Sequence, residues 1–130
     1  MRIQIRRRGV TADCEPSILQ RLGIGAGEKQ RIAERALAEL PGQGTILLDS
    51  GTTTLALARM LTNDLGLAVV TNSVAIAAVL SDHPDLQLHL LGGQVRTRTG
   101  AAVGSWVERA LSGTCIDVAF LGTNGFSLDR

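Results

Sequence analysis

The sequence predicts an α/β fold, with a three-layer, Rossmann-like parallel sheet that carries helices on both faces. Four short apolar runs, each long enough for a buried strand, follow one another along the 130 residues, and segments with helical spacing of apolar residues lie between them. Strands that alternate with helices form parallel sheets, because each connection crosses a face of the sheet. Aromatic residues make up only 2% of the chain, so the core is expected to be aliphatic.

The first predicted element is an amphipathic helix that begins near Glu28. Charged residues occupy one side of it, and the other side carries apolar residues at helical spacing, namely Ile32, Ala33, Ala36, Leu37 and Leu40. Pro41 and Gly42 stop the pattern.

The remaining elements alternate. Strands are expected at residues 45–48, 67–71, 86–91 and 116–121, and helices at 53–61, 74–80 and 103–111. Residues 92–102 are expected to form a polar loop that bears arginines. Trp106 is expected to pack in the core or at an interface, His89 to be half-buried within its strand, and His83 to be solvated in a turn.

Length and composition predict one domain. Residues 1–27 show no clean period and are expected to form an arm or linker, and residues 28–130 the α/β domain. The net charge of +1 gives no overall bias toward DNA, a membrane or acidic partners. A cluster of arginines in the first eight residues is typical of a solvated tail, and no apolar stretch follows it as in a signal peptide.

The two cysteines predict free thiols and a cytoplasmic protein. Cys14 and Cys115 lie far apart in the sequence, without CxxC spacing, so no metal site is expected. No apolar run has the length of a membrane span.

All four predicted strands end in small, polar residues. The sequence after the first reads DSGTTT, after the second TNS, after the third GG and after the fourth GTNG. In open parallel sheets the carboxyl ends of the strands and the N-termini of the following helices form the ligand site. Polar residues at these positions also serve as helix caps and turn residues, so a single loop of this kind has a purely structural alternative.

The first of these segments carries the most chemistry. Gly51 allows close backbone approach, while three threonine hydroxyls and the N–H groups of a helix start can surround a phosphate. Asp49 could accept hydrogen bonds from sugar hydroxyls. Arg96 and Arg98 could close over a phosphate, or could be surface arginines without a ligand. Signatures of dinucleotide binding, P-loop hydrolysis and serine hydrolases are absent from the sequence.

Five segments resemble the effector-sensing domain of DeoR-type bacterial transcriptional regulators. They are EKQRIA from Glu28, LLDSGTTTLALAR, VVTNS, LHLLGG and VAFLGTNG. The resemblance covers about residues 15–126 and implies the fold shared by ribose-5-phosphate isomerase and CoA-transferases. It also implies a phosphorylated sugar as the effector. No cofactor is expected.

The resemblance assigns the ligand site to the polar strand ends. The implied ligand-binding residues are Asp49, Ser50, Gly51, Thr52, Thr53, Thr54, Thr71, Asn72, Ser73, Gly92, Gly93, Gly122, Thr123, Asn124 and Gly125, to which the chemistry of the third loop adds Arg96. Many relatives have an acidic residue at the position of Asn124, and an amide cannot act as a general base. Lys29 lies on the first predicted helix, away from the strand ends. Both departures favour sensing over turnover.

Regulators of this type also carry an N-terminal winged helix-turn-helix and further elements after the fourth strand. Neither is found in this sequence, so the chain is expected to be truncated at both ends, to contact DNA only through the missing domain and to form a homo-oligomer. Two alternatives remain open from the sequence. One is a sugar-phosphate isomerase or deaminase on the same fold, and the other is an oligomerisation remnant without a ligand.

Overall fold

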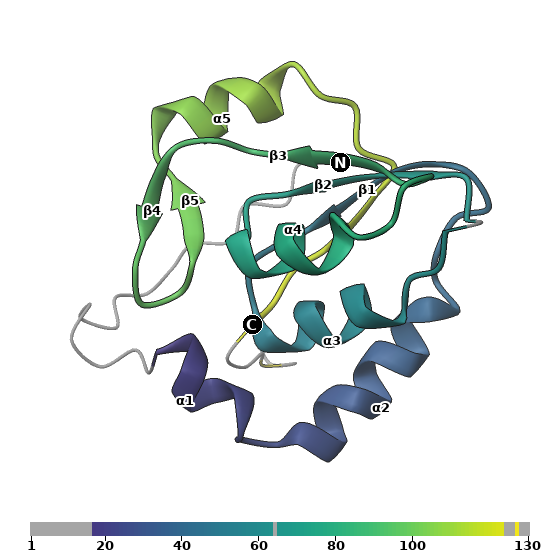
Figure 1. Ribbon diagram of the computed structural model, residues 1–130, viewed down its shortest axis with the longest axis vertical. Helices are drawn as coiled ribbons and strands as arrows, with labels where there is room; N and C mark the ends of the chain where they lie inside the picture. Colours follow the sequence, from purple (N-terminus) through teal and green to yellow (C-terminus); the bar gives the residue numbers. More distant parts are fainter. Residues whose placement is uncertain (1–16, 64, 124–126, 128–130) are drawn as a thin grey trace.

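The computed structural model describes residues 17–63, 65–123 and 127. Its main element is a parallel sheet with the strand order β3-β2-β1-β6, next to a separate two-stranded antiparallel hairpin, β4-β5 (Figure 1). The strands are β1 (Gly44–Leu48), β2 (Leu67–Thr71), β3 (Gln87–Leu90), β4 (Gln94–Arg96), β5 (Ala101–Val103) and β6 (Val118–Phe120). The helices are α1 (Ile18–Leu22), α2 (Ala26–Leu37), α3 (Thr52–Met60), α4 (Val74–Leu80) and α5 (Ser105–Ser112).

The predicted α/β class, with a parallel sheet between helices, is confirmed. Figure 1 shows α5 above the sheet, α3 and α4 below it, and α2 packed outside α3. Alternation along the strands produces this layering, because successive side chains point to opposite faces. Ile46, Leu48 and Val69 enter the larger core cluster with α3 and α4, whereas Leu47 and Val70 face α5.

The two central strands carry most of the buried residues of the sheet. Residues of β1 pair in register with both neighbours, so that Leu48 lies between Thr71 of β2 and Phe120 of β6. The outer strands are less covered, and Leu90 at the end of β3 is 52% exposed. The apolar runs thus predicted the four strands of the parallel sheet, although β3 and β6 are shorter than the runs, and only β1 and β2 are buried as the runs suggested.

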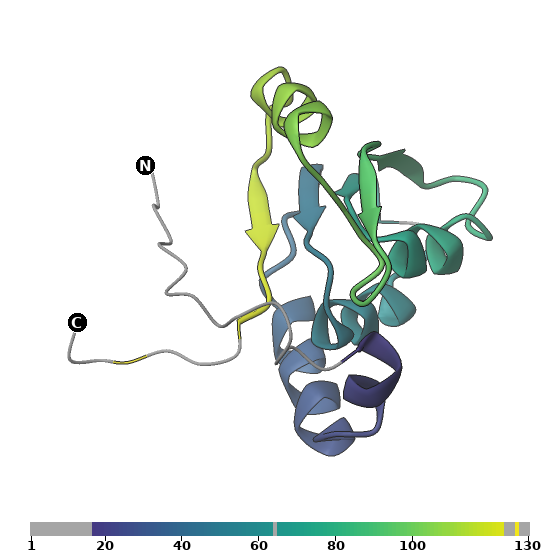
Figure 2. The ribbon, with the colours of Figure 1, turned by 90° about the vertical axis from the view of Figure 1, so that its left-hand side faces the viewer.

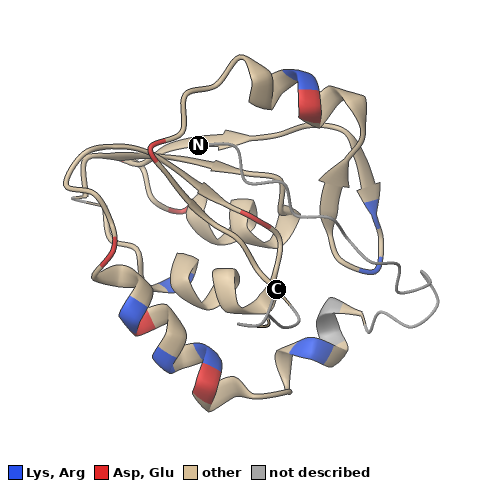
Figure 3. Ribbon diagram, turned by 180° about the vertical axis from the view of Figure 1, so that it is seen from behind, with Lys and Arg blue, Asp and Glu red and all other residues tan. Residues whose placement is uncertain are grey.

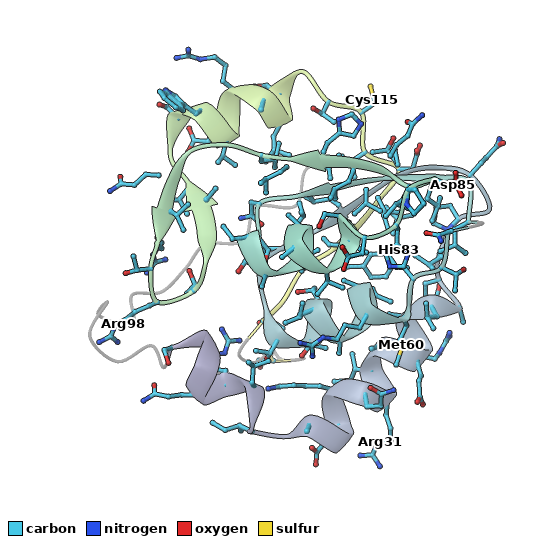
Figure 4. All side chains as sticks on the ribbon, viewed as in Figure 1. Arg31, Met60, His83, Asp85, Arg98 and Cys115 are labelled. Carbon is cyan, nitrogen blue, oxygen red and sulfur yellow. The ribbon has the colours of Figure 1, made fainter. Side chains whose placement is uncertain are left out.

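The face toward α5 is incompletely covered. A hollow of about 550 Å³ lies there, lined by residues of β1, β2, β3 and α5, together with the segment that follows α5. His89 lines this hollow and is exposed, which corrects the expectation of a half-buried histidine. Cys115 also lines it, and Figure 4 shows this cysteine beyond the C-terminal end of α5.

The first predicted helix exists but has different limits and a narrower buried face. α2 begins at Ala26, two residues before the expected start, and ends at Leu37. Ile32 is 57% exposed, against the prediction that it belongs to the apolar side. The helix packs through Ala33, Ala36 and Leu37, and Ile32 lies about 100° around the helix from its neighbour Ala33.

The expected arm contains a short helix. α1 begins after Ser17, whose side chain and that of Gln20 form a capping box, and the Lys29 ammonium on α2 donates to the carbonyl of Arg21. α1 also contacts α3. The arginine cluster at residues 2–8 and Cys14 lie outside the described residues.

The segment expected to be a loop is the β4-β5 hairpin. Val103, which was expected to begin a helix, ends β5, and α5 begins two residues later. Gly104 has a φ of 98°, a conformation that glycine adopts without strain and that separates the strand from the helix. Trp106 is 72% exposed on α5, so the prediction that it packs in the core is wrong, while its alternative place at an interface stays a prediction. His83, expected to be solvated, is half-buried, and its Nδ1 lies 2.7 Å from Oδ1 of Asn63.

Candidate functional site

The strand order identifies one position on the rim of the sheet as the candidate ligand site. β2 lies on one side of β1 and β6 on the other, and the helices that follow β1 and precede β6 cover opposite faces. This reversal is the topological switch point, where open α/β sheets bind their ligands beyond the carboxyl ends of the strands. The loop after β1 is therefore central, and Figure 2 shows β1 and β6 side by side in the sheet.

Hydrogen bonds between side chains and the backbone hold part of the loop after β1. The Ser50 N–H donates to Oδ1 of Asp49 at 2.8 Å and lies 3.1 Å from Oδ1 of Asn72. The Thr54 hydroxyl lies 2.6 Å from the carbonyl oxygen of Asp49 and 3.0 Å from that of Gly51. Thr54 therefore serves the shape of the loop, and its hydroxyl proton is not available to a ligand.

The start of α3, unlike the loop before it, has a polar group without a hydrogen-bond partner among the described residues. Its N-cap is Gly51, which makes no side-chain capping hydrogen bond, and the first N–H groups of any helix lack intrahelical partners. Thr52 follows and is 3% exposed, and its hydroxyl oxygen is buried with no hydrogen-bond partner among the described residues. Thr53 is half-buried beside it. An uncapped helix start with a buried, unpaired hydroxyl is suited to an anionic oxygen ligand.

The loop after β2 is largely structural. The buried Thr71 hydroxyl donates to the carbonyl of Leu48 at 2.7 Å and accepts from the Ser73 N–H at 3.1 Å. Ser73 caps α4 by accepting from the Ile76 N–H. Asn72 is half-buried, and its two side-chain groups connect the β1 loop to Ala102 of the hairpin. Asn72 is thus the residue of this loop whose side chain joins the β1 loop to the hairpin.

The two glycines after β3 have unequal surroundings. A Cβ at Gly92 would meet nothing within 4 Å. A Cβ at Gly93 would lie 2.8 Å from the carbonyl oxygen of Val103 and 3.0 Å from Cγ2 of Val107, so Gly93 allows the chain to pass against β5 and α5. Gly93 therefore has a structural role in chain packing, while a ligand contact at either glycine stays a prediction.

The hairpin brings a residue to the site that sequence reasoning missed. The Ser50 hydroxyl donates to the carbonyl of Thr99 at 3.1 Å, and the Thr99 hydroxyl oxygen is itself buried without a partner. Thr99 lies in the turn after Arg96, whose carbonyl accepts from the Gly100 N–H at 2.8 Å. A polar turn residue carries no sequence signal for such a contact. Arg96 is half-buried, and Arg98 projects from the hairpin tip (Figure 4).

The loop after β6 is described only in part. The Asp49 N–H donates to the carbonyl of Phe120, and Gly122 lies close enough to Ser50 that an added Cβ would be 3.9 Å from the Ser50 carbonyl oxygen. Thr123 is exposed. Asn124 and Gly125, both predicted site residues, lie outside the described residues.

Charged groups are placed mainly outside the sheet. Figure 3 shows basic and acidic residues together on α2 and α5, and basic residues alone on the hairpin, with few charged residues on the strands. Within the described residues no group of three His, Cys, Asp or Glu side chains could hold a metal ion, and no described helix has the length and apolarity to span a membrane.

Comparison with known proteins gives a consistent result. The family model "DeoR C terminal sensor domain" matches residues 25–130. The glycerol-3-phosphate regulon repressor of Escherichia coli is 34% identical over 102 residues, which are 78% of this chain and 40% of the repressor. The HTH-type transcriptional repressor GlcR of Bacillus subtilis is 35% identical over 107 residues, covering 82% of this chain and 41% of GlcR.

A third relative gives a similar match. The HTH-type transcriptional regulator GlpR of Haloferax volcanii is 39% identical over 101 residues, or 78% of this chain and 39% of that protein. The chain thus spans about two fifths of the length of these curated relatives. The matched region includes every described strand and the whole rim. The chain belongs to the family of DeoR C-terminal sensor domains.

Proposed function

We propose that this chain is the effector-sensing part of a transcriptional repressor of sugar metabolism, and that its effector is a small phosphorylated sugar. The observation that carries the proposal is the buried Thr52 hydroxyl, which has no partner among the described residues and lies at the uncapped start of α3, at the switch point of the sheet. A phosphate oxygen would satisfy this hydroxyl and the helix N–H groups together. The name of the Escherichia coli relative, which contains glycerol-3-phosphate, supports the same class of ligand.

The remaining rim residues would bind the sugar. Asp49 and Asn72 are both half-buried beside the start of α3, and each offers oxygen acceptors for sugar hydroxyls. In this reading ligand binding changes the DNA affinity of a helix-turn-helix domain, which the names of the HTH-type relatives suggest for the whole protein.

Isothermal titration calorimetry tests the site. The chain is titrated with glycerol-3-phosphate, with a panel of hexose and pentose phosphates, and with the matching unphosphorylated compounds. We expect one phosphate ester to bind and its unphosphorylated counterpart not to bind. Asp49→Ala and Thr53→Ala should each weaken binding about tenfold or more, because each removes a charge-assisted or neutral hydrogen bond to the ligand.

A matched control is Asp85→Ala. Asp85 is exposed before β3, at the opposite end of the sheet from the rim, and Figure 4 shows it far from the hairpin. Its removal should leave the affinity unchanged. Unaltered binding by both rim variants would refute this placement of the site, and binding of no phosphate ester would refute the sensing function.

A turnover assay distinguishes a sensor from an enzyme. Within the described residues the rim offers the carboxylate of Asp49 but no histidine, cysteine or lysine beside it, and both described histidines lie elsewhere. We therefore infer that the chain binds its ligand without converting it. Aldose-to-ketose conversion or loss of ammonia from an amino sugar phosphate, abolished by Asp49→Ala, would replace the sensor with an enzyme.

The chain is also expected to form a homo-oligomer. In the described part of the sheet, β3 and β6 have free edges, and the hollow under α5 exposes apolar side chains. Sedimentation velocity at several protein concentrations measures the state directly. A monomer at every concentration would contradict this expectation without affecting the ligand site.

A further inference from the structure

Two threonine hydroxyls are buried without a partner in the described residues, and both lie beside the loop after β1. They are Oγ1 of Thr52 and Oγ1 of Thr99. Burying a hydroxyl without a hydrogen bond costs free energy, so buried polar groups are nearly always paired. Two unpaired hydroxyls at one end of the sheet therefore point to a group that binds between them.

Ser50 connects the two threonines. It precedes Thr52 by two residues, and its hydroxyl donates to the Thr99 carbonyl at 3.1 Å. The two unpaired hydroxyls thus come from different elements, the start of α3 and the turn of the hairpin, that meet at Ser50.

The hairpin is also hydrogen-bonded to the loop after β2. The Ala102 N–H donates to the carbonyl of Asn72 at 2.8 Å, and the Val74 N–H donates to the carbonyl of Gly100 at 2.9 Å. Ser73 and Ala101 form an isolated antiparallel bridge. The turn that carries Thr99 is consequently fastened along one side to the end of β2 and the start of α4, while on the other side the Ser50 hydroxyl contacts it from the β1 loop.

We propose that Thr99 is a ligand-binding residue, and that a phosphate ester bound between Thr52 and Thr99 fastens the β4-β5 hairpin to the start of α3. This proposal rests on the proposed function and adds the residue through which the ligand acts on the hairpin. The Thr99 hydroxyl donates to an oxygen of the ligand, so the bound state gains a contact across the crevice that the free state lacks.

The hairpin carries the effect of binding to α5. Only Gly104 separates Val103 at the end of β5 from Ser105 at the start of α5, and Gly93 before β4 packs against Val103 and Val107. Hairpin and helix are therefore in direct contact, so a ligand that fastens the hairpin also acts on α5. The exposed Trp106 on α5 gives that helix a spectroscopic reporter, because it is the chain's single tryptophan and no tyrosine is present.

A first measurement needs no ligand. Thr99→Val replaces the hydroxyl by a methyl group of similar size. Because the hydroxyl is unpaired, the ligand-free variant should melt at the same temperature as the wild type or higher. A clear decrease in the melting temperature would mean that the hydroxyl is already satisfied in the free protein, and would overturn the proposal.

The second measurement is binding by the full chain, with glycerol-3-phosphate, hexose phosphates and inorganic phosphate as probes. Thr99→Val should weaken binding of the best probe about tenfold, and Thr99→Ser, which keeps the hydroxyl, should restore most of it. The matched control is Thr97→Val, the same substitution at an exposed position of the same turn. It should bind as the wild type does.

The third measurement follows the hairpin. Hydrogen exchange should show slower exchange of the 94–103 segment when the probe is bound to the wild type, and a smaller effect in Thr99→Val at equal site occupancy. Emission from Trp106 should change with the same dependence on probe concentration. Equal protection in both proteins would overturn the fastening of the hairpin.

The outcomes separate the two proposals. If the wild type binds a phosphate ester and Thr99→Val binds it equally well, the role of Thr99 is refuted and the proposed function stands. If the wild type binds none of the probes, the proposed function fails and the role of Thr99 fails with it. Equal loss of binding in Thr97→Val and Thr99→Val would also refute the role of Thr99, because the loss would then be a general effect on the turn.

Discussion

The adjacent glycines 92 and 93 differ in the space around them, and this difference is testable. Gly93 has a φ of 158°, and a Cβ there would lie 2.8 Å from the Val103 carbonyl oxygen, whereas Gly92 is exposed with open space around it. We expect Gly93→Ala to lower the free energy of unfolding by about 2 kcal/mol, because the chain must shift away from β5 and α5. Gly92→Ala should change it by less than about 0.5 kcal/mol.

Urea denaturation measures both variants. Equal stability of the two would contradict the close approach of residue 93 to β5. A large loss in Gly92→Ala would instead mean that the exposed turn has a contact that the structure does not contain.

At the same scale, the sequence predicted which residues gather at the rim but not what their hydroxyls do. Thr52, Thr54 and Thr71 are all buried, yet Thr54 and Thr71 donate to backbone carbonyls, whereas Thr52 has no partner in the part of the chain that the structure describes. Residue type and spacing are the same for a structural and a ligand-binding threonine. The direction of the hydroxyl depends on neighbouring strands, which the local sequence does not specify.

At the scale of elements, the stability of α5 depends on few contacts. Val107 is its one buried residue, 7% exposed, and packs in the smaller core cluster with Val70, Leu91 and Ala102. Val107→Ala should lower the free energy of unfolding by about 2 kcal/mol, from lost apolar burial and the cavity left behind. Val74→Ala, at a position that is 46% exposed on α4, is the control and should cost less than about 0.5 kcal/mol.

Hydrogen exchange distinguishes a local from a global effect of Val107→Ala. Exchange should accelerate in α5 and the hairpin more than in β1 and β2, because the larger cluster does not contain Val107. Uniform acceleration throughout the sheet would contradict the assignment of α5 to a separate cluster.

Elements with long apolar runs were predictable, and short ones were not. β2 occupies the predicted residues, and α4 does so as well, since each is a continuous apolar segment with polar ends. β4 and β5 have three residues each, which is too few to show a period of two. The sequence therefore predicted a loop where the hairpin lies. Val103 was predicted to begin the helix, because its apolar side chain also fits the helical spacing of α5.

For the whole molecule, the predicted three layers are present, but the layers are unequal. Two helices cover one face of the sheet directly and α2 backs them, while the other face has α5 and an open hollow. Sequence patterning identified alternating faces, yet it could not show how much of each face the helices cover, because coverage depends on where the crossovers place them.

The unequal faces predict unequal costs for two neighbouring substitutions in β1. Leu48 is fully buried in the larger cluster, and Leu47, half-buried, faces the smaller one. Leu48→Ala should lower the free energy of unfolding by about 3 to 4 kcal/mol, and Leu47→Ala by about 1 to 2, because less apolar surface and a smaller cavity are involved. Both residues lie in the same central strand, so backbone effects of alanine are matched. Urea unfolding at two protein concentrations gives the comparison. Equal costs at low concentration would contradict the unequal coverage, whereas a cost for Leu47→Ala that grows with concentration would mean that a second copy covers this face.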